Sequence, residues 1–129
     1  MDNILNEFKN VLIVLVVFLV LDVPMLTIIN KDMYQNLLNN INNGATVETK
    51  TIIFSAIITY LLLAYGLYHF AIKPNSLYNA ALFGLVVYGV YDFTNLATLA
   101  KYGFKEAIID TIWGTVLCFL TTVVVKRLL

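Results

Sequence analysis

Four long apolar runs, separated by polar connections, dominate the chain. They extend over residues 11–29, 51–72, 77–100 and 104–125. A helix that crosses about 30 Å of hydrocarbon needs roughly 20 apolar residues at about 1.5 Å rise per residue, and each run is about this long. Helices are favoured over a membrane β-barrel because each run is long and does not alternate between apolar and polar residues. The pattern predicts an all-α integral membrane four-helix bundle that forms a single domain over residues 1–129.

The connections predict which spans are neighbours. Residues 73–76 (KPNS) and 101–105 (KYGFK) are short turns, so we expect the second, third and fourth spans to run antiparallel beside one another. The connection over residues 30–50 is long and rich in Asn. Two structures stay open for it, a short amphipathic helix in the membrane interface or a loop with chance apolar residues. The apolar residues at helical spacing are Tyr34, Leu37, Leu38 and Ile41.

An even number of spans places both termini on the same side of the membrane. The side with the termini would carry the basic residues Lys9, Lys73, Lys126 and Arg127. The opposite side would carry Lys31, Lys50, Lys101 and Lys105. Four basic residues on each side specify no orientation by the positive-inside rule. The terminal amine tilts the balance slightly, so cytoplasmic termini are weakly favoured.

The composition supports a membrane protein and argues against nucleic acid as a partner. Of the 129 residues, 60% are hydrophobic and 12% are charged, with a mean hydropathy of +0.85. Soluble domains have about 45–50% apolar and about 25% charged residues, so the lipid bilayer is the expected surrounding. Eight basic and eight acidic residues cancel, which leaves no basic field for nucleic acid.

No residue pattern indicates a known catalytic chemistry. The sequence has no Ser-His-Asp, HExxH or clustered-His pattern, so we expect that the protein is not an enzyme and has no cofactor. The single cysteine, Cys118, lies in an apolar run and is interpreted as a small buried hydrophobic side chain. Whether a metal ion binds stays open.

Three aspartates interrupt the apolar spans at one depth. Asp22 precedes the end of the first span by seven residues, Asp92 precedes the end of the third by eight, and Asp110 follows the start of the fourth by six. At about 1.5 Å per residue, all three lie about 9–12 Å from the membrane face that carries the long connection. An ionised Asp near mid-bilayer costs about 2.5–3.5 kcal/mol. We therefore expect the three side chains to face one another inside the bundle.

Hydrogen-bond donors at the same depth would lower this cost, and the candidates are Asn95, Tyr88, Tyr91, Thr59 and Trp113. No Lys or Arg lies at that depth to neutralise the carboxyl groups. Two interpretations stay open: the acids share protons or hold a small cation, or they are protonated structural contacts between helices. The candidate polar site consists of Asp22, Asp92, Asn95, Asp110, Trp113, Tyr88 and Thr59.

The stretch YGVYDFTNLATLAKYGFKEAIIDTIWGTVL (residues 88–117) carries two polar motifs at fixed spacing in an apolar context. It resembles the domain of unknown function 2177 family, a family of membrane proteins without an assigned activity. The resemblance implies a four-span bundle with a polar layer, and it implies nothing about a substrate. The matching residues are Tyr91, Asp92, Thr94, Asn95, Leu96, Ala97, Asp110, Trp113 and Gly114. A weaker likeness extends to Leu21–Asp22 and Tyr65–Gly66, and Met25 stands where the family often has tryptophan.

Three classes of function follow as hypotheses. Small size and the small residues Ala80, Ala81 and Gly84 slightly favour a structural, assembly or membrane-organising role, with a homo-oligomer as the candidate partner. An enzyme acting on lipids has the least support. The alternative to the structural role is a proton- or cation-responsive carrier, channel or sensor that uses Asp22, Asp92, Asn95 and Asp110.

Overall fold

The computed structural model describes residues 2–129, and no strand occurs in that range. Four helices are long and apolar enough to cross a membrane: Asp2–Ile29, Thr49–Ile72, Leu77–Thr98 and Phe104–Leu128. The predicted all-α bundle is confirmed. Two of the four long helices end in a π-helical turn, so the elements are α1 (Asp2–Pro24), η1 (Met25–Ile29), α2 (Lys31–Asn42), α3 (Thr49–Leu67), η2 (Tyr68–Ile72), α4 (Leu77–Thr98) and α5 (Phe104–Leu128).

The first long helix changes its winding at Pro24. Proline has no backbone N–H and its ring crowds the preceding turn, so the regular α-helical hydrogen bonds end there. The π-helical turn η1 follows, and Asn30 closes it by donating its backbone N–H to the carbonyl oxygen of Met25 at 2.9 Å. The change lies two residues beyond Asp22. The first span therefore ends soon after the acid, and the chain turns into α2.

The long connection contains a helix, α2, and not only a loop. That this helix lies in the membrane interface stays a prediction. α2 ends where the backbone adopts left-handed angles, with φ of 56° at Asn43 and 82° at Gly44. Leu37 of α2 is buried in an apolar cluster with Tyr102 and Ala107. α2 therefore packs against the start of α5 and the turn that precedes it.

α4 and α5 form the closest helix pair, and two glycines make this approach possible. A Cβ atom on Gly84 would clash with the carbonyl oxygen of Gly114 and would lie 2.9 Å from Cα of Thr115. A Cβ atom on Gly114 would clash with the ring of Tyr88. The small residues of the third span, with Ala80 and Gly84 buried, thus pack α4 against α5 within one chain.

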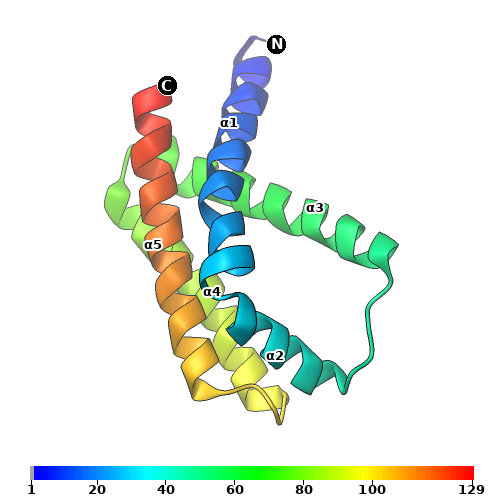
Figure 1. Ribbon diagram of the computed structural model, residues 1–129. Helices are drawn as coiled ribbons and strands as arrows, with labels where there is room; N and C mark the ends of the chain where they lie inside the picture. Colours follow the sequence, from blue (N-terminus) through cyan, green and yellow to red (C-terminus); the bar gives the residue numbers. More distant parts are fainter. Residues whose placement is uncertain (1) are drawn as a thin grey trace.

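α3 diverges from the other long helices, as Figure 1 shows. Its C-terminal part, with Ala64 and Leu67, is buried in the main apolar core beside Val14 and Phe18 of α1. Its N-terminal half is exposed, and within residues 2–129 it does not pack along α2 or α4. The second and third spans therefore meet at η2, next to the turn at residues 73–76, and separate towards the opposite end.

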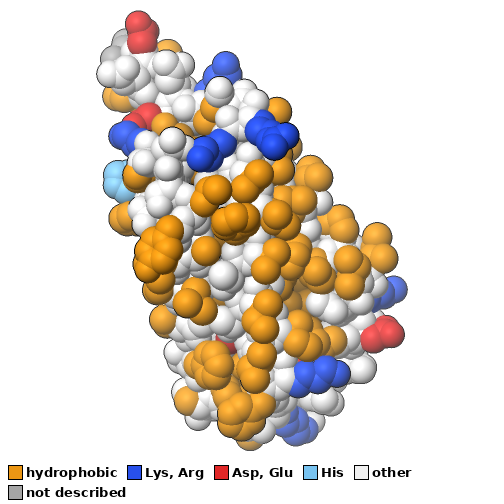
Figure 2. Space-filling model, turned by 90° about the vertical axis from the view of Figure 1, so that its left-hand side faces the viewer, with side chains coloured by type: hydrophobic (Ala, Val, Ile, Leu, Met, Phe, Trp, Pro, Cys, Tyr) orange, Lys and Arg blue, Asp and Glu red, His pale blue; other side chains and the backbone are white. Residues whose placement is uncertain are grey.

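On the face shown in Figure 2, most charged side chains lie towards the two ends, and apolar side chains cover the surface between them. Large apolar side chains are exposed on each long helix, for example Val20, Phe54, Val90 and Ile112. A soluble monomer rarely exposes so much continuous apolar surface, whereas lipid tails cover it without cost. Both chain termini lie at the same end of the bundle (Figure 1).

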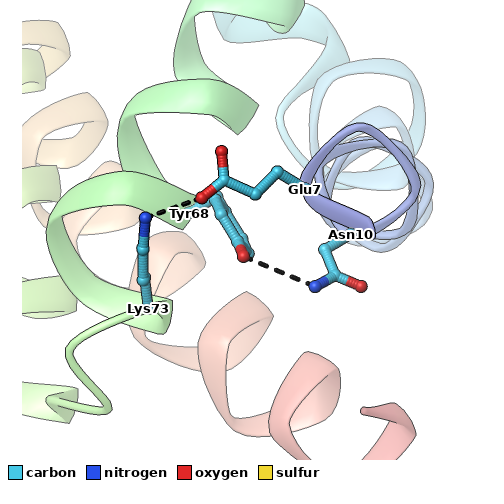
Figure 3. Close-up of polar contacts among 4 residues, drawn as sticks. All are labelled: Glu7, Asn10, Tyr68 and Lys73. Atoms are coloured by element: carbon cyan, nitrogen blue, oxygen red, sulfur yellow. Dashed lines mark hydrogen bonds and ion pairs between the residues drawn. The ribbon is translucent and has the colours of Figure 1, made fainter. Parts of the chain in front are cut away.

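Two polar contacts join α1 to the end of the second span near the termini (Figure 3). The Lys73 ammonium donates to Oε1 of Glu7 at 2.6 Å, and both side chains are about half exposed. The Asn10 amide donates to the hydroxyl of Tyr68 at 3.4 Å. The hydrogen bond with Glu7 raises the pKa of Lys73. We call Glu7 and Lys73 the terminal ion pair.

Candidate functional site

Asp22 lies inside the bundle on α1 and connects three helices. Its side chain is 5% exposed. The Tyr60 hydroxyl of α3 donates to Oδ2 at 2.7 Å, and the Trp113 indole N–H of α5 donates to Oδ1 at 2.9 Å. Tyr60 also packs edge-on against Phe18, which holds its hydroxyl in place. Each carboxyl oxygen of Asp22 therefore has one neutral donor.

Asp92 is fully buried on α4, and its donors come from α5 and the turn before it. The Tyr102 hydroxyl donates to Oδ1 at 2.5 Å, and the Thr111 hydroxyl donates to Oδ2 at 3.1 Å. Tyr102 belongs to a tight turn in which its backbone N–H donates to the carbonyl oxygen of Leu99. Burial, and then the hydrogen bond to Asp92, raise the pKa of Tyr102. The phenol therefore stays protonated and remains a donor.

Asp110 joins the network from α5 and connects it to α2. Its Oδ1 accepts a hydrogen bond from the Tyr34 hydroxyl at 2.7 Å. Burial, and then this hydrogen bond, raise the pKa of Tyr34. The side chains of Asp92 and Asp110 are neighbours, although the hydrogen bonds that the structure shows for them within residues 2–129 go to other residues. A hydrogen bond between the two carboxyl groups forms only when one of them carries a proton, because ionised carboxyl groups are acceptors only.

A cavity of about 440 Å³ lies between these elements. Asp22 and Asp110 line it from different helices, and among the described residues its wall contains no Lys, Arg or His. The wall is formed by Asp22, Leu26, Tyr34, Leu37, Leu38, Ile41, Ser55, Ala56, Thr59, Tyr60, Leu63, Val87, Tyr88, Tyr91, Tyr102 and Asp110. It therefore combines two carboxyl groups with aromatic and aliphatic surface.

Most of the predicted site residues lie at or next to this cavity. Asp92 is not part of the wall but neighbours Asp110, and Trp113 reaches the site through Asp22. The residues of the predicted site that line the cavity are Asp22, Asp110, Tyr88 and Thr59. Of the seven residues, only Asn95 has neither a place in the wall nor a side-chain hydrogen bond to a residue of the wall within the range 2–129.

Several of the predicted donors do not bind an acid. In the part of the chain that the structure describes, the side chains of Asn95, Tyr88, Tyr91 and Thr59 donate no hydrogen bond to any of the three aspartates. Asn95 lies one turn after Asp92 on α4, but both oxygens of that carboxyl group already accept hydrogen bonds from other residues. Of the five candidate donors, Trp113 is the one that binds an aspartate.

The donors that sequence reasoning missed are Tyr34, Tyr60, Tyr102 and Thr111. Tyr60 directly follows Thr59. Counting residues from the membrane face along the span therefore gives the position of the donor to within one residue, but it does not show which of the two side chains faces α1. Tyr34 and Tyr102 lie in connections, which a count along the spans does not reach. A signal was present, because a tyrosine near a span end has an apolar ring and a polar tip that can reach inwards.

The three acids do not form a ready-made metal site. Among residues 2–129, no group of three or more His, Cys, Asp or Glu side chains is arranged to hold a metal ion. The carboxyl groups are bound by neutral O–H and N–H groups instead. Hydroxyl groups can donate or accept, so this arrangement suits proton exchange or the binding of a cation by charge.

Four long apolar helices with large exposed apolar side chains define an integral, multi-pass membrane protein, and this one has carboxyl groups buried between its helices. The chain belongs to the family described as Predicted membrane protein (DUF2177), whose sequence profile matches residues 8–126. The resemblance of the chain to this family is thereby confirmed, and the matched range includes all three aspartates. No curated protein and no solved structure matches the chain significantly.

Proposed function

We propose that the protein responds to protons or cations inside the membrane through its acid-lined cavity. The observation that supports this role is that Asp22 and Asp110, on different helices, line one cavity without a basic residue in its described wall. Carboxyl groups away from water and without a counter-charge attract protons or cations. The proposal includes a carrier, a channel and a sensor, because each needs a group that changes its charge or its occupancy.

The donors around the acids suit a group that changes its protonation. A hydroxyl donates to an ionised carboxyl group and accepts from a protonated one, so Tyr34 and Tyr60 can serve both forms. The indole of Trp113 only donates, so Oδ1 of Asp22 is an acceptor in both forms and a proton would reside on Oδ2, facing Tyr60. A lysine in place of these donors would stabilise the ionised form alone.

Flux into proteoliposomes tests the proposal. Asp22→Asn and Asp110→Asn keep the side-chain volume and one acceptor oxygen, but they remove the ionisable group. Asp32 of α2 is exposed and lies outside the cavity wall, so Asp32→Asn is the matched control. We expect pH- or cation-dependent flux in the wild type and the control, and its loss in both cavity variants.

A sensor without flux needs a second measurement. Trp113 is the only tryptophan, and its indole donates to Asp22, so its fluorescence reports on that carboxyl group. We expect a change in emission with pH or cation concentration that Asp22→Asn abolishes and Asp32→Asn retains. Equal flux and equal fluorescence responses in all the folded proteins would contradict the proposal.

A structural or assembly role is the second candidate, and the exposed half of α3 favours it. Ile53, Phe54 and Ile57 are each more than half exposed, and a second copy of the chain can cover this apolar surface as lipid does. The small residues Ala80, Ala81 and Gly84 give this role no support, because Ala80 and Gly84 are buried and Gly84 is already packed against α5. Under this role, the Asn variants should change stability or oligomeric state without any change in flux.

A further inference from the structure

We infer that the cavity binds an organic ammonium ion with an apolar body, an inference that rests on the proposed cation response. The cavity of about 440 Å³ is much larger than the roughly 30 Å³ of one water molecule in the liquid, and it falls within the range of about 300–1,000 Å³ of small-molecule sites. A proton or a bare metal ion would leave most of this space unfilled. An organic molecule of metabolite size fits it.

The charge of the wall selects the sign of that molecule. Asp22 and Asp110 are acidic, and no basic side chain accompanies them among the described residues of the wall. Each oxygen of Asp22 accepts one hydrogen bond from the protein, whereas a carboxyl oxygen can accept two. The carboxyl groups therefore keep acceptor capacity for the N–H groups or the charge of a bound ammonium.

The remaining wall suits an apolar body around that charge. The hydroxyls of Tyr34, Tyr60 and Tyr102 are already engaged with the aspartates, so these residues offer their rings to a ligand. Aromatic rings attract ammonium groups through their negative faces. The rings that line the cavity are those of Tyr34, Tyr60, Tyr88, Tyr91 and Tyr102, and leucine, isoleucine and valine side chains complete the apolar surface.

α3 provides a route from the bilayer. Ser55, Ala56 and Thr59 line the cavity from α3, in or next to the part of this helix that does not pack along α2 or α4 in the described chain. Helix packing therefore does not seal the wall on either side of α3, in agreement with its divergence in Figure 1. A cation with an apolar body concentrates in the membrane and can enter from the side.

A lipid headgroup is another source of ammonium, but its charge fits less well. In phosphatidylethanolamine and phosphatidylcholine, a phosphate lies next to the ammonium. A phosphate near Asp22 or Asp110 would be repelled by the carboxyl groups. A free organic cation has no such negative charge, so we assign the cavity to a free cation.

Equilibrium dialysis of tritiated benzyltrimethylammonium with the full chain in dodecyl maltoside micelles tests the inference. Neopentylbenzene has the same shape without the charge and serves as the matched competitor. We expect saturable binding that neopentylbenzene does not displace. Asp22→Asn and Asp110→Asn should each weaken binding by about tenfold or more, the equivalent of one lost charge contact, whereas Asp32→Asn should bind like the wild type.

Several results would overturn the inference. These are the absence of saturable binding, displacement by neopentylbenzene, and unchanged binding in both cavity variants. Displacement by added phosphatidylethanolamine or phosphatidylcholine would assign the ammonium to a lipid headgroup and would also overturn it. The competition arms use the wild type, so they remain decisive if a variant does not fold. Absence of ammonium binding with an intact, aspartate-dependent pH response would reject this inference and leave the proposed function standing.

Discussion

The carboxyl groups of the buried aspartates and of the terminal ion pair differ in their exposure and in the charge of their partners. Glu7 is about half exposed and is paired with the full positive charge of Lys73 at 2.6 Å (Figure 3). Asp22 is 5% exposed and has only neutral donors. The first arrangement lies at the end of the bundle, where water and lipid headgroups also stabilise the charge. The second lies between helices, where only the protein can do so.

This difference indicates where the charge is fixed and where it can change. A neighbouring ammonium stabilises only the ionised form of a carboxyl group. Hydroxyl donors stabilise either form, because they reverse their role when the carboxyl group gains a proton. The aspartates can therefore change their protonation without a movement of the helices that hold them. This property is the physical basis of the proposed response to protons or cations.

The largest effect is expected at Asp92. Leucine branches at the same atom but has no acceptor, so Asp92→Leu leaves the hydroxyls of Tyr102 and Thr111 without a partner. Its larger methyl groups also crowd this fully buried position. Hydrogen bonds between membrane helices contribute about 0.6 kcal/mol on average and at most about 1.7 kcal/mol, so the loss of two should lower the unfolding free energy by about 1–3 kcal/mol. Unfolding by SDS in mixed micelles measures this change.

Asp92→Asn is the control for this prediction. Its carbonyl oxygen accepts from Tyr102 and its amide donates to the Thr111 hydroxyl, so its stability should stay close to that of the wild type. A leucine variant as stable as the wild type would mean that the two hydroxyls find other partners. The hydrogen bonds of the buried acids would then contribute no more to the unfolding free energy than the terminal ion pair does.

Hydropathy along the sequence predicts which segments form long helices, but it does not predict the angles between these helices. The four apolar runs and the turn at residues 73–76 determined the number of long helices and their connectivity, because backbone groups in lipid must be paired within a helix. The divergence of α3 was not predicted, since an apolar run of that length specifies burial in lipid but no angle to its neighbours. The packing of α2 through Leu37 depends on contacts with Tyr102 that its own periodicity does not show.

The candidate site was predicted from the free-energy cost of an aspartate in a membrane span and not from the geometry of the side chains. An aspartate in a membrane span is expensive, so Asp22, Asp92 and Asp110 stand out in the sequence. Their partners do not stand out, because Tyr60 and Tyr102 resemble ordinary packing or interface residues. Which tyrosine reaches an acid depends on helix rotation and on the conformation of a turn, and one sequence without a structure specifies neither.

A double-mutant cycle at Asp22 should give the next largest effect. Tyr60→Phe and Asp22→Leu each remove the hydrogen bond between α1 and α3, which is 2.7 Å long. We expect a coupling free energy of about 0.6–1.7 kcal/mol between the two changes. The same cycle with Tyr65→Phe, an exposed tyrosine on α3, should show no coupling. Coupling of equal size in both cycles would contradict a specific contact between Tyr60 and Asp22.

Tyr34→Phe should release α2 with a smaller effect on the whole bundle. The variant loses the hydrogen bond to Asp110, whereas Leu37 keeps the helix on its apolar cluster. Amide hydrogen exchange should become faster in α2 and stay unchanged in α4 and α5. Faster exchange across all helices would instead indicate that the contact stabilises the entire fold.

The same contact predicts a response to high pH. Burial and Asp110 raise the pKa of Tyr34 above its ordinary value of 10.0. A group with a raised pKa contributes its stability fully below the ordinary value, and this contribution is lost as the pH rises through the raised value. The protection factor of the α2 amides, which corrects for the base catalysis of exchange itself, should therefore be constant below about pH 10 and fall only above it. In Tyr34→Phe this alkaline step should be absent.

The smallest effect is expected at the terminal ion pair. Glu7→Gln is a carboxyl-to-amide change like Asp92→Asn, but at an exposed ion pair, and such pairs contribute little to stability. The unfolding free energy should match that of the wild type within error. The hydrogen bond between the two side chains raises the pKa of Lys73 and lowers the pKa of Glu7. The small contribution of the pair is therefore complete between the ordinary pKa values of 4.5 and 10.5. It is lost as the pH rises through the raised pKa of Lys73 or falls through the lowered pKa of Glu7.

Salt separates the two networks in the same experiment. At about 1 M salt the Debye length falls to about 3 Å, which screens exposed charges but hardly affects buried contacts. The difference between the wild type and Glu7→Gln, already small, should disappear, whereas the loss in Asp92→Leu should persist. If Glu7→Gln destabilised the protein as much as Asp92→Leu did, burial and neutral donors would not distinguish the two networks. The aspartates would then be no better suited to a change of charge than the terminal ion pair.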